Sequence, residues 1–287
     1  MASLVVSGNQ VLGANELPGI RMTYQPLADG IAAQVVVAPG THIERPVHLC
    51  FGVVARTGVQ RIVSHFEIGA GASVAFVAHC TFPNAEQVDH IMQSDVQVGE
   101  HASMRYNETH FHGESGGTRT YPTSHVTVAE GGRYASEFGL STGRAGLVDL
   151  DFAVDVAADG VAELSAKVMG YGDDDITVKE TIRLNGAGAR GLAKSRIAVR
   201  ERARSQVLST TEGNAPFAKG HVDCVEIVRD QATANAVPVV RVTDPRAQIT
   251  HEAAIGTVDK KELETLMARG LEEETAVDVI VRGMLGE

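Results

Sequence analysis

The sequence lacks several features that mark common classes of protein. Its three cysteines are an odd number and far apart, so they do not read as a disulfide framework and favour free thiols in a reducing cytoplasm. Apolar runs such as "IAAQVVVAP" span only a few residues, far short of the roughly 20 needed to cross a bilayer. The N-terminus has neither the basic nor the apolar region of a secretion signal. We therefore expect a cytoplasmic protein with no membrane-spanning segment.

Charge and motif content exclude further classes. With a formal net charge of −11, the chain is unlike a general binder of nucleic acid or of anionic membranes. The sequence has no P-loop, dinucleotide-binding fingerprint or nucleophile elbow. Its content of hydrophobic and charged residues, 44% and 21%, is that of an ordinary globular protein with a sizeable core.

One local pattern recurs along the chain at nearly constant intervals. An apolar residue, any residue and a second apolar residue are followed by a small or polar turn, as in "FEIGAG" and "VQVGEH". The first six copies start 28 to 31 residues apart, and a seventh starts 58 residues after the sixth, which is two intervals of 29. The starts are Val35, Phe66, Val96, Val126, Val154, Ile182 and Val240. Self-similarity at a fixed period is typical of repeat architectures.

The length of the repeat selects among repeat folds. Each unit is too short for a strand–helix–strand crossover, and no helical apolar stripe appears before residue 258. Two strands of about ten residues with two turns fit the period, and stacking such units gives a coil of parallel strands. We predict a mainly β fold, a right-handed parallel β-helix with residues 1–257 as its core. An antiparallel sandwich is an alternative. A propeller is disfavoured because its blades need roughly 40–45 residues and usually carry aromatic signatures, whereas this chain has no tryptophan.

Residues 258–287 change character and predict a small helical subdomain. Asp259 and Glu262 form a capping-box pair that opens a first helix, and Gly270 is a suitable residue to end it. The acidic start of "EEETAVDVIVRGMLG" suits the dipole of a second helix. The apolar stripes of the two helices contain Leu263, Leu266 and Met267, and then Ala276, Val277, Ile280, Val281 and Met284. Because the pair is too small to fold alone, we expect it to pack on the coil or to dock a partner.

Three residues near the C-terminal end of the coil are candidates for metal chemistry. Cys224 lies in "HVDCVEIVRD", and His251 and Glu252 lie in "AQITHEAAIG". An isolated cysteine in a β-rich interior is usually a small buried hydrophobe. His251 and Glu252 are neighbours on an expected strand, so their side chains should point to opposite faces. Residue type and spacing leave open whether the three form one site, and no C-x-x-C or H-x-x-x-H spacing of a structural zinc site lies nearby.

A second group of histidines and cysteines occupies similar positions in successive repeats. His48 and His79 lie thirteen residues after their repeat starts, Cys80 and His110 fourteen, and Cys50 fifteen. If the repeats stack, these residues form a ladder, which either binds metal or sulfur or is only a stack of similar side chains. The nearby "THFHGE" does not fit a cupin metal motif, because its glutamate follows the second histidine after one residue rather than three or four.

The last quarter of the chain contains an ordered set of motifs. They are Cys224, "ANAVPVV" (234–240), "DPRAQITHEAAIG" (244–256) and "ELETLMARGLEEETAVDVIVRGM" (262–284). This set resembles the SufB/SufD family of iron–sulfur cluster assembly proteins. In that family a cysteine precedes an Ala-x-x-x-Pro segment, a His-Glu-Ala or His-Gly-Ala triplet, a Leu-x-x-Leu-x-x-Arg-Gly-Leu helix turn and an Ile-Val-x-Gly ending. The resemblance implies a right-handed parallel β-helix with a helical C-terminal domain.

The resemblance also implies a scaffold rather than an enzyme. A transient iron–sulfur cluster would be held through iron by Cys224, Glu252 and His251, and then passed to apo iron–sulfur recipient proteins. The implied partners are an ABC-type ATPase, SufC, and either a second copy of this chain in a homodimer or a SufB/SufD paralogue. The ATPase would dock on the C-terminal helices, at Leu263, Leu266, Met267, Val277 and Ile280. Because the chain has all three ligands, it is more similar to SufB than to SufD.

Two alternatives stay open at this point. The first is a SufD-like accessory subunit that needs a separate SufB. The second is an unrelated β-coil enzyme or metal protein that uses the ladder of His48, His79 and Cys80. A transporter permease, which an ABC-type partner would also suggest, is excluded by the short apolar runs.

Overall fold

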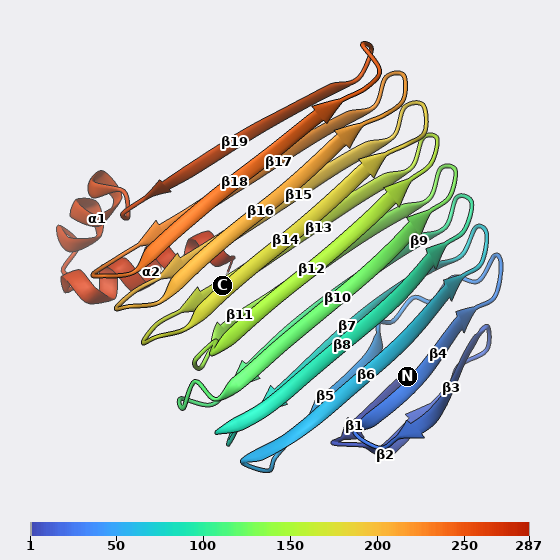
Figure 1. Ribbon diagram of the computed structural model, residues 1–287, viewed down its shortest axis with the longest axis horizontal. Coiled ribbons are helices and arrows are strands. Elements are labelled where there is room, and N and C mark those ends of the chain that lie inside the picture. The colour runs from blue at the N-terminus through green and yellow to red at the C-terminus, as the bar shows by residue number, and fades with distance from the viewer. Residues whose placement is uncertain (1, 287) are drawn as a thin grey trace.

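The computed structural model describes residues 2–286, which wind into a flattened β-solenoid (Figure 1). Two sheets lie face to face, and each turn of the coil contributes one strand to each sheet. Strands contain 63% of the residues and form about eight turns, followed by two helices. The predicted parallel β-helix with a helical end is thereby confirmed.

The first sheet has ten strands, in the order β19-β17-β15-β13-β11-β9-β7-β5-β1-β2. Their bounds are β1 (Ser3–Ser7), β2 (Gln10–Asn15), β5 (Val47–Gly52), β7 (Ser73–Phe82), β9 (Ser103–His112), β11 (Arg133–Thr142), β13 (Val161–Gly170), β15 (Arg190–Val199), β17 (Lys219–Val228) and β19 (Gln248–Gly256).

The second sheet has nine strands, in the order β18-β16-β14-β12-β10-β8-β6-β4-β3. Their bounds are β3 (Ile20–Leu27), β4 (Gly30–Val37), β6 (Thr57–Ile68), β8 (Gln87–Val98), β10 (Thr118–Val128), β12 (Leu147–Val156), β14 (Asp175–Leu184), β16 (Arg204–Gly213) and β18 (Thr233–Val242). Neighbouring strands are parallel in both sheets, except that β1 pairs with β2 and β3 with β4 in antiparallel fashion.

The repeat starts recognised in the sequence form a single column of the nine-stranded sheet. Val35 pairs with Phe66, and the register continues in the same way from strand to strand as far as Ile182. Ile182 then pairs with Thr211, and Thr211 with Val240. The copy missing from the sequence pattern is therefore Thr211, which is buried like the apolar starts and whose hydroxyl has no hydrogen-bond partner.

Alternate side chains of both sheets fill the interior. Many strands alternate strictly between buried and more exposed positions, as the period-two pattern of the sequence predicts. Phe66 of the nine-stranded sheet meets Phe76 and Tyr106 of the ten-stranded sheet edge to face, with ring centroids 5.2 and 5.9 Å apart. These aromatic contacts join the two sheets across the core.

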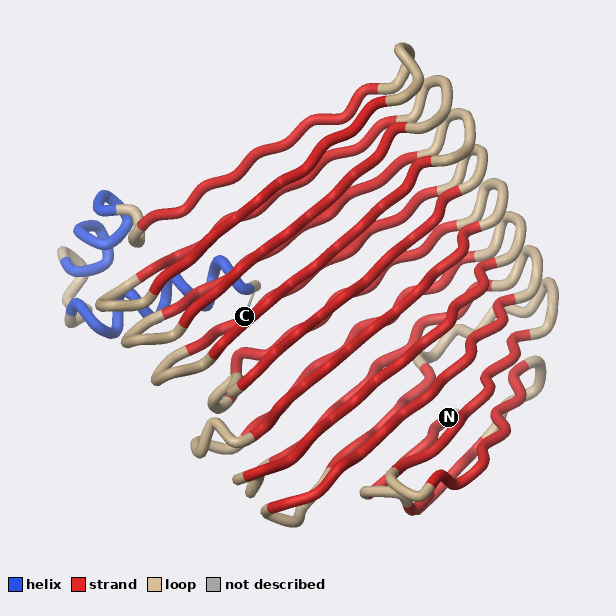
Figure 2. The backbone as a smooth tube through the Cα atoms, viewed as in Figure 1, coloured by secondary structure: helices blue, strands red, loops and turns tan. Residues whose placement is uncertain are grey.

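Helix α1 (Lys260–Met267) follows the last strand closely (Figure 2). It begins where the capping box predicted, because the Asp259 carboxylate accepts a hydrogen bond of 2.9 Å from the backbone N–H of Glu262. Among residues 2–286, no helix is both long enough and apolar enough to cross a membrane.

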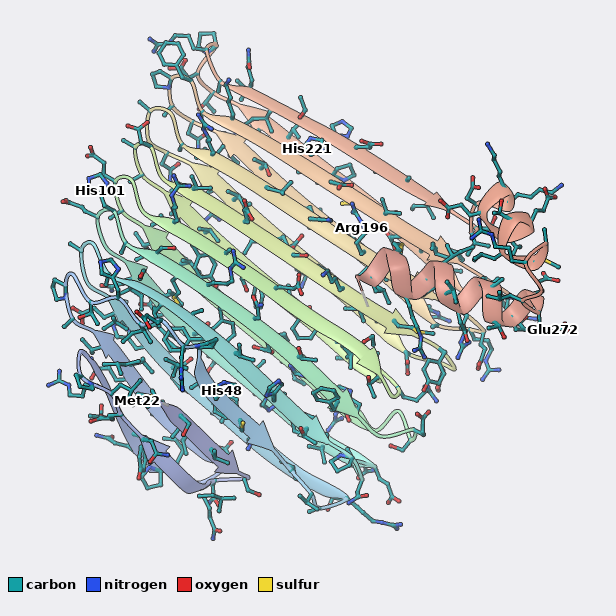
Figure 3. All side chains as sticks on the ribbon, turned by 180° about the vertical axis from the view of Figure 1, so that it is seen from behind. Met22, His48, His101, Arg196, His221 and Glu272 are labelled. Atoms are coloured by element: carbon teal, nitrogen blue, oxygen red, sulfur yellow. The ribbon has the colours of Figure 1, made fainter. Side chains whose placement is uncertain are left out.

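Helix α2 (Glu273–Leu285) lies across the outer face of the ten-stranded sheet (Figure 3). Its Val277 and Val281 pack on Ala198 of β15 and Ile227 of β17. These two strand residues interrupt the alternation of buried and exposed positions, because the helix covers side chains that face outward. The helical segment is thus anchored to the side of the solenoid near its C-terminal end.

Candidate functional site

Cys224 lies in the middle of β17 on the interior face of the solenoid, and its side chain is fully buried. It donates a long hydrogen bond from Sγ to Oγ of Ser209, 3.9 Å away, which faces it from β16 in the other sheet. Only one further turn, formed by β18 and β19, separates this level from the end of the solenoid.

The thiol of Cys224 has polar neighbours within the apolar core. Ser195 is its register partner on β15, and Ser209 also donates a hydrogen bond of 3.2 Å to Oε2 of Glu180. Burial is the main cause that raises the pKa of the Cys224 thiol, and it raises the pKa of Glu180 to about 8. Both groups are therefore neutral at pH 7, so the thiol needs a nearby cation before it becomes a thiolate.

His251 lies on β19, the neighbour of β17. The parallel register places His251 beside Val222 and Ala253 beside Cys224. Register partners on adjacent strands point to the same face of a sheet, so His251 is on the interior side, as Cys224 is. The structure thus brings Cys224 and His251 to one face of the last two strands of this sheet.

Glu252 is on the opposite, outer face of the same strand. Its register partner is Asp223, which Arg196 holds with a hydrogen bond of 3.1 Å from Nη1 and a second one from Nη2. These hydrogen bonds are the main cause that lowers the pKa of the Asp223 carboxyl. The opposite orientations of His251 and Glu252 agree with the expectation from their adjacency.

The level that carries His251 and Glu252 is the least covered part of the solenoid. β18 and β19 are the last strands of their sheets, so each presents a row of backbone N–H and C=O groups that no neighbouring strand of residues 2–286 covers. The interior faces of these two strands carry Val240, Val242 and Ile255, which are 38%, 47% and 47% exposed because no further turn within residues 2–286 covers them.

The predicted ladder of histidines and cysteines is divided by the structure into two columns. Cys50 pairs with His79 on the outer side of the coil, and Cys80 pairs with His110 on the inner side. His48 also faces outward, 6.4 Å from His79 between ring centroids. Val35 and Phe66 are register partners, but Cys50, fifteen residues after Val35, pairs with His79, which lies thirteen residues after Phe66. Equal offsets from the repeat starts therefore do not mean equal positions. A difference of one residue moves a side chain to the other face.

The inward pair belongs to a larger buried group. His90 reaches Cys80 and His110 from β8 in the facing sheet, and the donor atoms of the three side chains lie within 4.8 Å of one another. All three side chains are fully buried. Burial lowers the pKa of His90 well below its ordinary value and raises the pKa of Cys80 well above its own. No sequence pattern pointed to His90, because its contact is made between sheets and not along one.

The structure separates the five helix residues expected to bind a partner. Val277 is buried against the chain's own sheet, and Leu263 packs partly on the same cluster. Leu266 and Ile280 are half-buried, and Met267 is 41% exposed. In this chain the side chains of Leu266, Met267 and Ile280 therefore remain accessible to a partner, whereas the side chain of Val277 is not accessible.

The fold and the C-terminal site define a two-sheet parallel β-helix protein with an uncovered last turn and a docked helix pair. A family described as SUF system FeS cluster assembly, SufBD core domain, matches residues 55–284 of the chain. The chain belongs to the SufBD family of iron–sulfur cluster assembly proteins. The family likeness extends through the repeat region, whereas the sequence motifs lie only between residues 224 and 284.

Relatives match over nearly the whole chain. An iron–sulfur cluster assembly SufBD family protein of Methanocaldococcus jannaschii is 36% identical over 284 residues, which is 99% of this chain and 90% of that protein. A SufBD family protein of Pyrococcus horikoshii is 34% identical over 287 residues, which is 100% of this chain and 87% of that protein. The similarity therefore includes the solenoid and the helices together.

Proposed function

We propose that this chain is a scaffold, not an enzyme, on which an iron–sulfur cluster is assembled at the C-terminal end of the solenoid. Cys224, His251 and Glu252 are the proposed iron ligands. The observation that carries the proposal is the position of Cys224, one strand away from an open sheet edge that bears His251 on the same face. Membership in a cluster assembly family supports the same role.

The chemistry of this ligand set suits a cluster that is built and then released. A thiolate is the usual iron ligand of such clusters. The buried Cys224 thiol is neutral, and an arriving iron ion lowers its pKa and displaces its proton. One thiolate completed by imidazole and carboxylate binds iron less firmly than a full set of thiolates. The cluster is thus cargo, which apo iron–sulfur proteins can take over.

The orientation of the ligands favours a site shared between two chains. His251 and Glu252 lie on opposite faces of β19, so one chain does not direct all three donors to one point. A second copy, related by a two-fold axis at the open ends, pairs with the free edges and covers Val240, Val242 and Ile255. A SufB/SufD paralogue in place of the second copy is the alternative, with this chain as the accessory subunit.

The proposed ATPase partner docks on the helix pair. The sequence has no P-loop of its own, so an ABC-type ATPase of the SufC kind would supply ATP hydrolysis. Leu266, Met267 and Ile280 form the proposed contact. Movement of the ATPase would reach the cluster site through α2, which packs directly on β17, the strand of Cys224. A reducing cytoplasm, where the three unpaired cysteines stay free, is the proposed location.

Anaerobic reconstitution with ferrous iron and sulfide tests the site. We expect the wild-type chain to turn brown with thiolate-to-iron absorption, and Cys224→Ser to lose most of this absorption and of the bound iron. Cys50→Ser is the matched control, since Cys50 lies on the outer face of β5, and it should behave as the wild type. An unchanged spectrum in Cys224→Ser contradicts the ligand assignment. A wild-type chain that binds a cluster only together with a paralogue supports the accessory role instead.

A further inference from the structure

The interior of the N-terminal half contains three potential metal ligands that the proposed cluster site does not use. Cys80 and His110 are register partners on β7 and β9, and His90 faces them from β8. A tetrahedral ion at about 2.0–2.3 Å from its ligands needs donor atoms roughly 3.4–3.6 Å apart. The three donor atoms all lie within 4.8 Å of one another, so shifts on the order of 1 Å would bring them to that spacing.

His90 makes no hydrogen bond with its ring nitrogens. Nδ1 and Nε2 are both buried and have no partner, and the ring packs on Phe82 with centroids 4.7 Å apart. A buried polar atom without a partner is unfavourable and calls for an explanation. A bond from one nitrogen to a metal ion supplies that partner.

His110 is held in the way that metal-binding histidines commonly are. Its Nε2 is 2.6 Å from Oε1 of Glu108, and a carboxylate on one ring nitrogen orients the ring and directs the other nitrogen to the metal. That other nitrogen, Nδ1, is 3.3 Å from Nε2 of His112. His112 donates from Nδ1 to the carbonyl of Arg144 at 3.1 Å, so its Nε2 carries a lone pair and is available as a fourth donor.

We propose that Cys80, His90 and His110 bind a divalent transition-metal ion of the class that prefers mixed thiolate and imidazole ligands, such as Zn²⁺. A Cys80 thiolate and the Glu108 carboxylate together neutralise a dication inside the apolar core, and the thiol proton is released to solvent. The ligands are buried and come from both sheets, which is typical of a structural site. The ion thus joins β7 and β9 to β8.

This site is independent of the proposed cluster site. Strands β9 and β17 are four positions apart in the ten-stranded sheet, a separation of about 19 Å at roughly 4.8 Å per strand. Loss of Cys224 should therefore leave the metal site intact, and loss of Cys80 should be visible in a chain that lacks Cys224. The failure of one proposal can be told from the failure of the other.

Cobalt is the probe, because Co²⁺ bound to a thiolate in tetrahedral geometry absorbs in the visible and near-ultraviolet regions. The full chain is produced in minimal medium with Co²⁺, since a closed site is loaded during folding. We expect about one Co²⁺ per chain by mass spectrometry and a thiolate-to-cobalt band. Cys80→Ser should lose the band, and His90→Leu should lower the cobalt content at least about tenfold. Cys50→Ser and Cys224→Ser are the matched controls and should keep both.

Thermal unfolding gives a second readout that does not depend on Cys80. His90→Leu removes an unpaired buried imidazole, so without metal it should unfold at a temperature no lower than the metal-free wild type. After growth with Zn²⁺, the wild type should unfold at a higher temperature than His90→Leu. A cobalt band that persists in Cys80→Ser when Cys224 is also replaced by Ser overturns the proposal. So does a wild-type chain that carries neither metal after growth in supplemented medium.

Discussion

At the N-terminal end of the solenoid the chain covers its own core, whereas at the C-terminal end it does not. Leu4 and Met22, in the first strands of the two sheets, are only 2% and 6% exposed, and Val11 of β2 packs against the core. At the other end Val240 and Ile255 also face the interior of the two sheets, and they are several times more exposed. The antiparallel hairpins β1–β2 and β3–β4 account for the difference, since the described part of the chain continues from β19 into helices and forms no such hairpin there.

The difference between the two ends indicates which end is suited to bind a partner. A parallel coil has two ends, and an uncovered end exposes both apolar core and unpaired strand edges. At the N-terminal end, the edge strand β3 also contains Pro26, which has no N–H to offer a further strand. The end that lacks these protections is also the end that carries His251 and Glu252. This difference supports the proposal that the second subunit and the cluster lie at the C-terminal end.

The largest effect is expected from a charge placed in the open end. Val240→Lys puts an ammonium group into the interior column that the second subunit would cover, and an unpaired buried charge is strongly unfavourable. We expect the dissociation constant of the dimer to rise on the order of 100-fold, about 2.7 kcal/mol, by analytical ultracentrifugation. Cluster assembly should fall with the dimer.

Leu12→Lys is the matched control at the opposite end. Leu12 lies on β2 and is 65% exposed, so a lysine there meets water and should change neither the dimer nor the cluster. The comparison between the ends breaks if Val240→Lys dimerises like the wild type, or if Leu12→Lys is the variant that dissociates.

The second expected effect concerns the buried carboxylates of the two halves. Glu108 lies 2.6 Å from His110, whereas Glu180 has only the hydroxyl of Ser209, and burial raises the pKa of Glu180 from 4.5 to about 8. The folded chain therefore keeps a proton that the unfolded chain releases. The stability contributed by this proton is fully present below pH 4.5 and is lost as the pH rises through about 8.

Glu180→Gln removes this dependence. We expect the free energy of unfolding at pH 7 to rise by ~3 kcal/mol, with a smaller difference near pH 5, in denaturant titrations. Glu163→Gln is the control, because Glu163 lies on the outer face of β13, where the same substitution does not change the core. Equal stability of Glu180→Gln and the wild type across this pH range would show that Glu180 is not a protonated group in the core.

The sequence was sufficient for the architecture because every repeat start occupies the same register position. A fixed period of 28 to 31 residues is a direct consequence of that column, and only Thr211 concealed one copy, because a threonine can also fill a buried position. The orientations of His251 and Glu252 likewise followed from their adjacency on one strand. Where side chains alternate along a single strand, local sequence is enough.

The parts that the sequence could not predict are contacts between elements. The group of Cys80, His90 and His110 depends on which side chains of the two sheets face each other. Turns of unequal length change these contacts without changing the repeat pattern of the sequence. The apolar stripe of α2 indicated that one of its faces is covered, but not that Ala198 and Ile227 cover Val277. Both are decided by packing in three dimensions.

The smallest effect is expected at the helix pair, where the exposed and the docked faces differ. Met267 is exposed on α1, so Met267→Glu should leave the fold intact and weaken binding of an ABC-type ATPase by about tenfold, ~1.4 kcal/mol, in isothermal titration calorimetry. Val54→Glu adds the same charge at a 66% exposed residue between β5 and β6, far along the coil from the helices, and should bind like the wild type. If Val54→Glu weakens binding and Met267→Glu does not, the ATPase docks near the covered end, and the division of roles between the two ends has to be reversed.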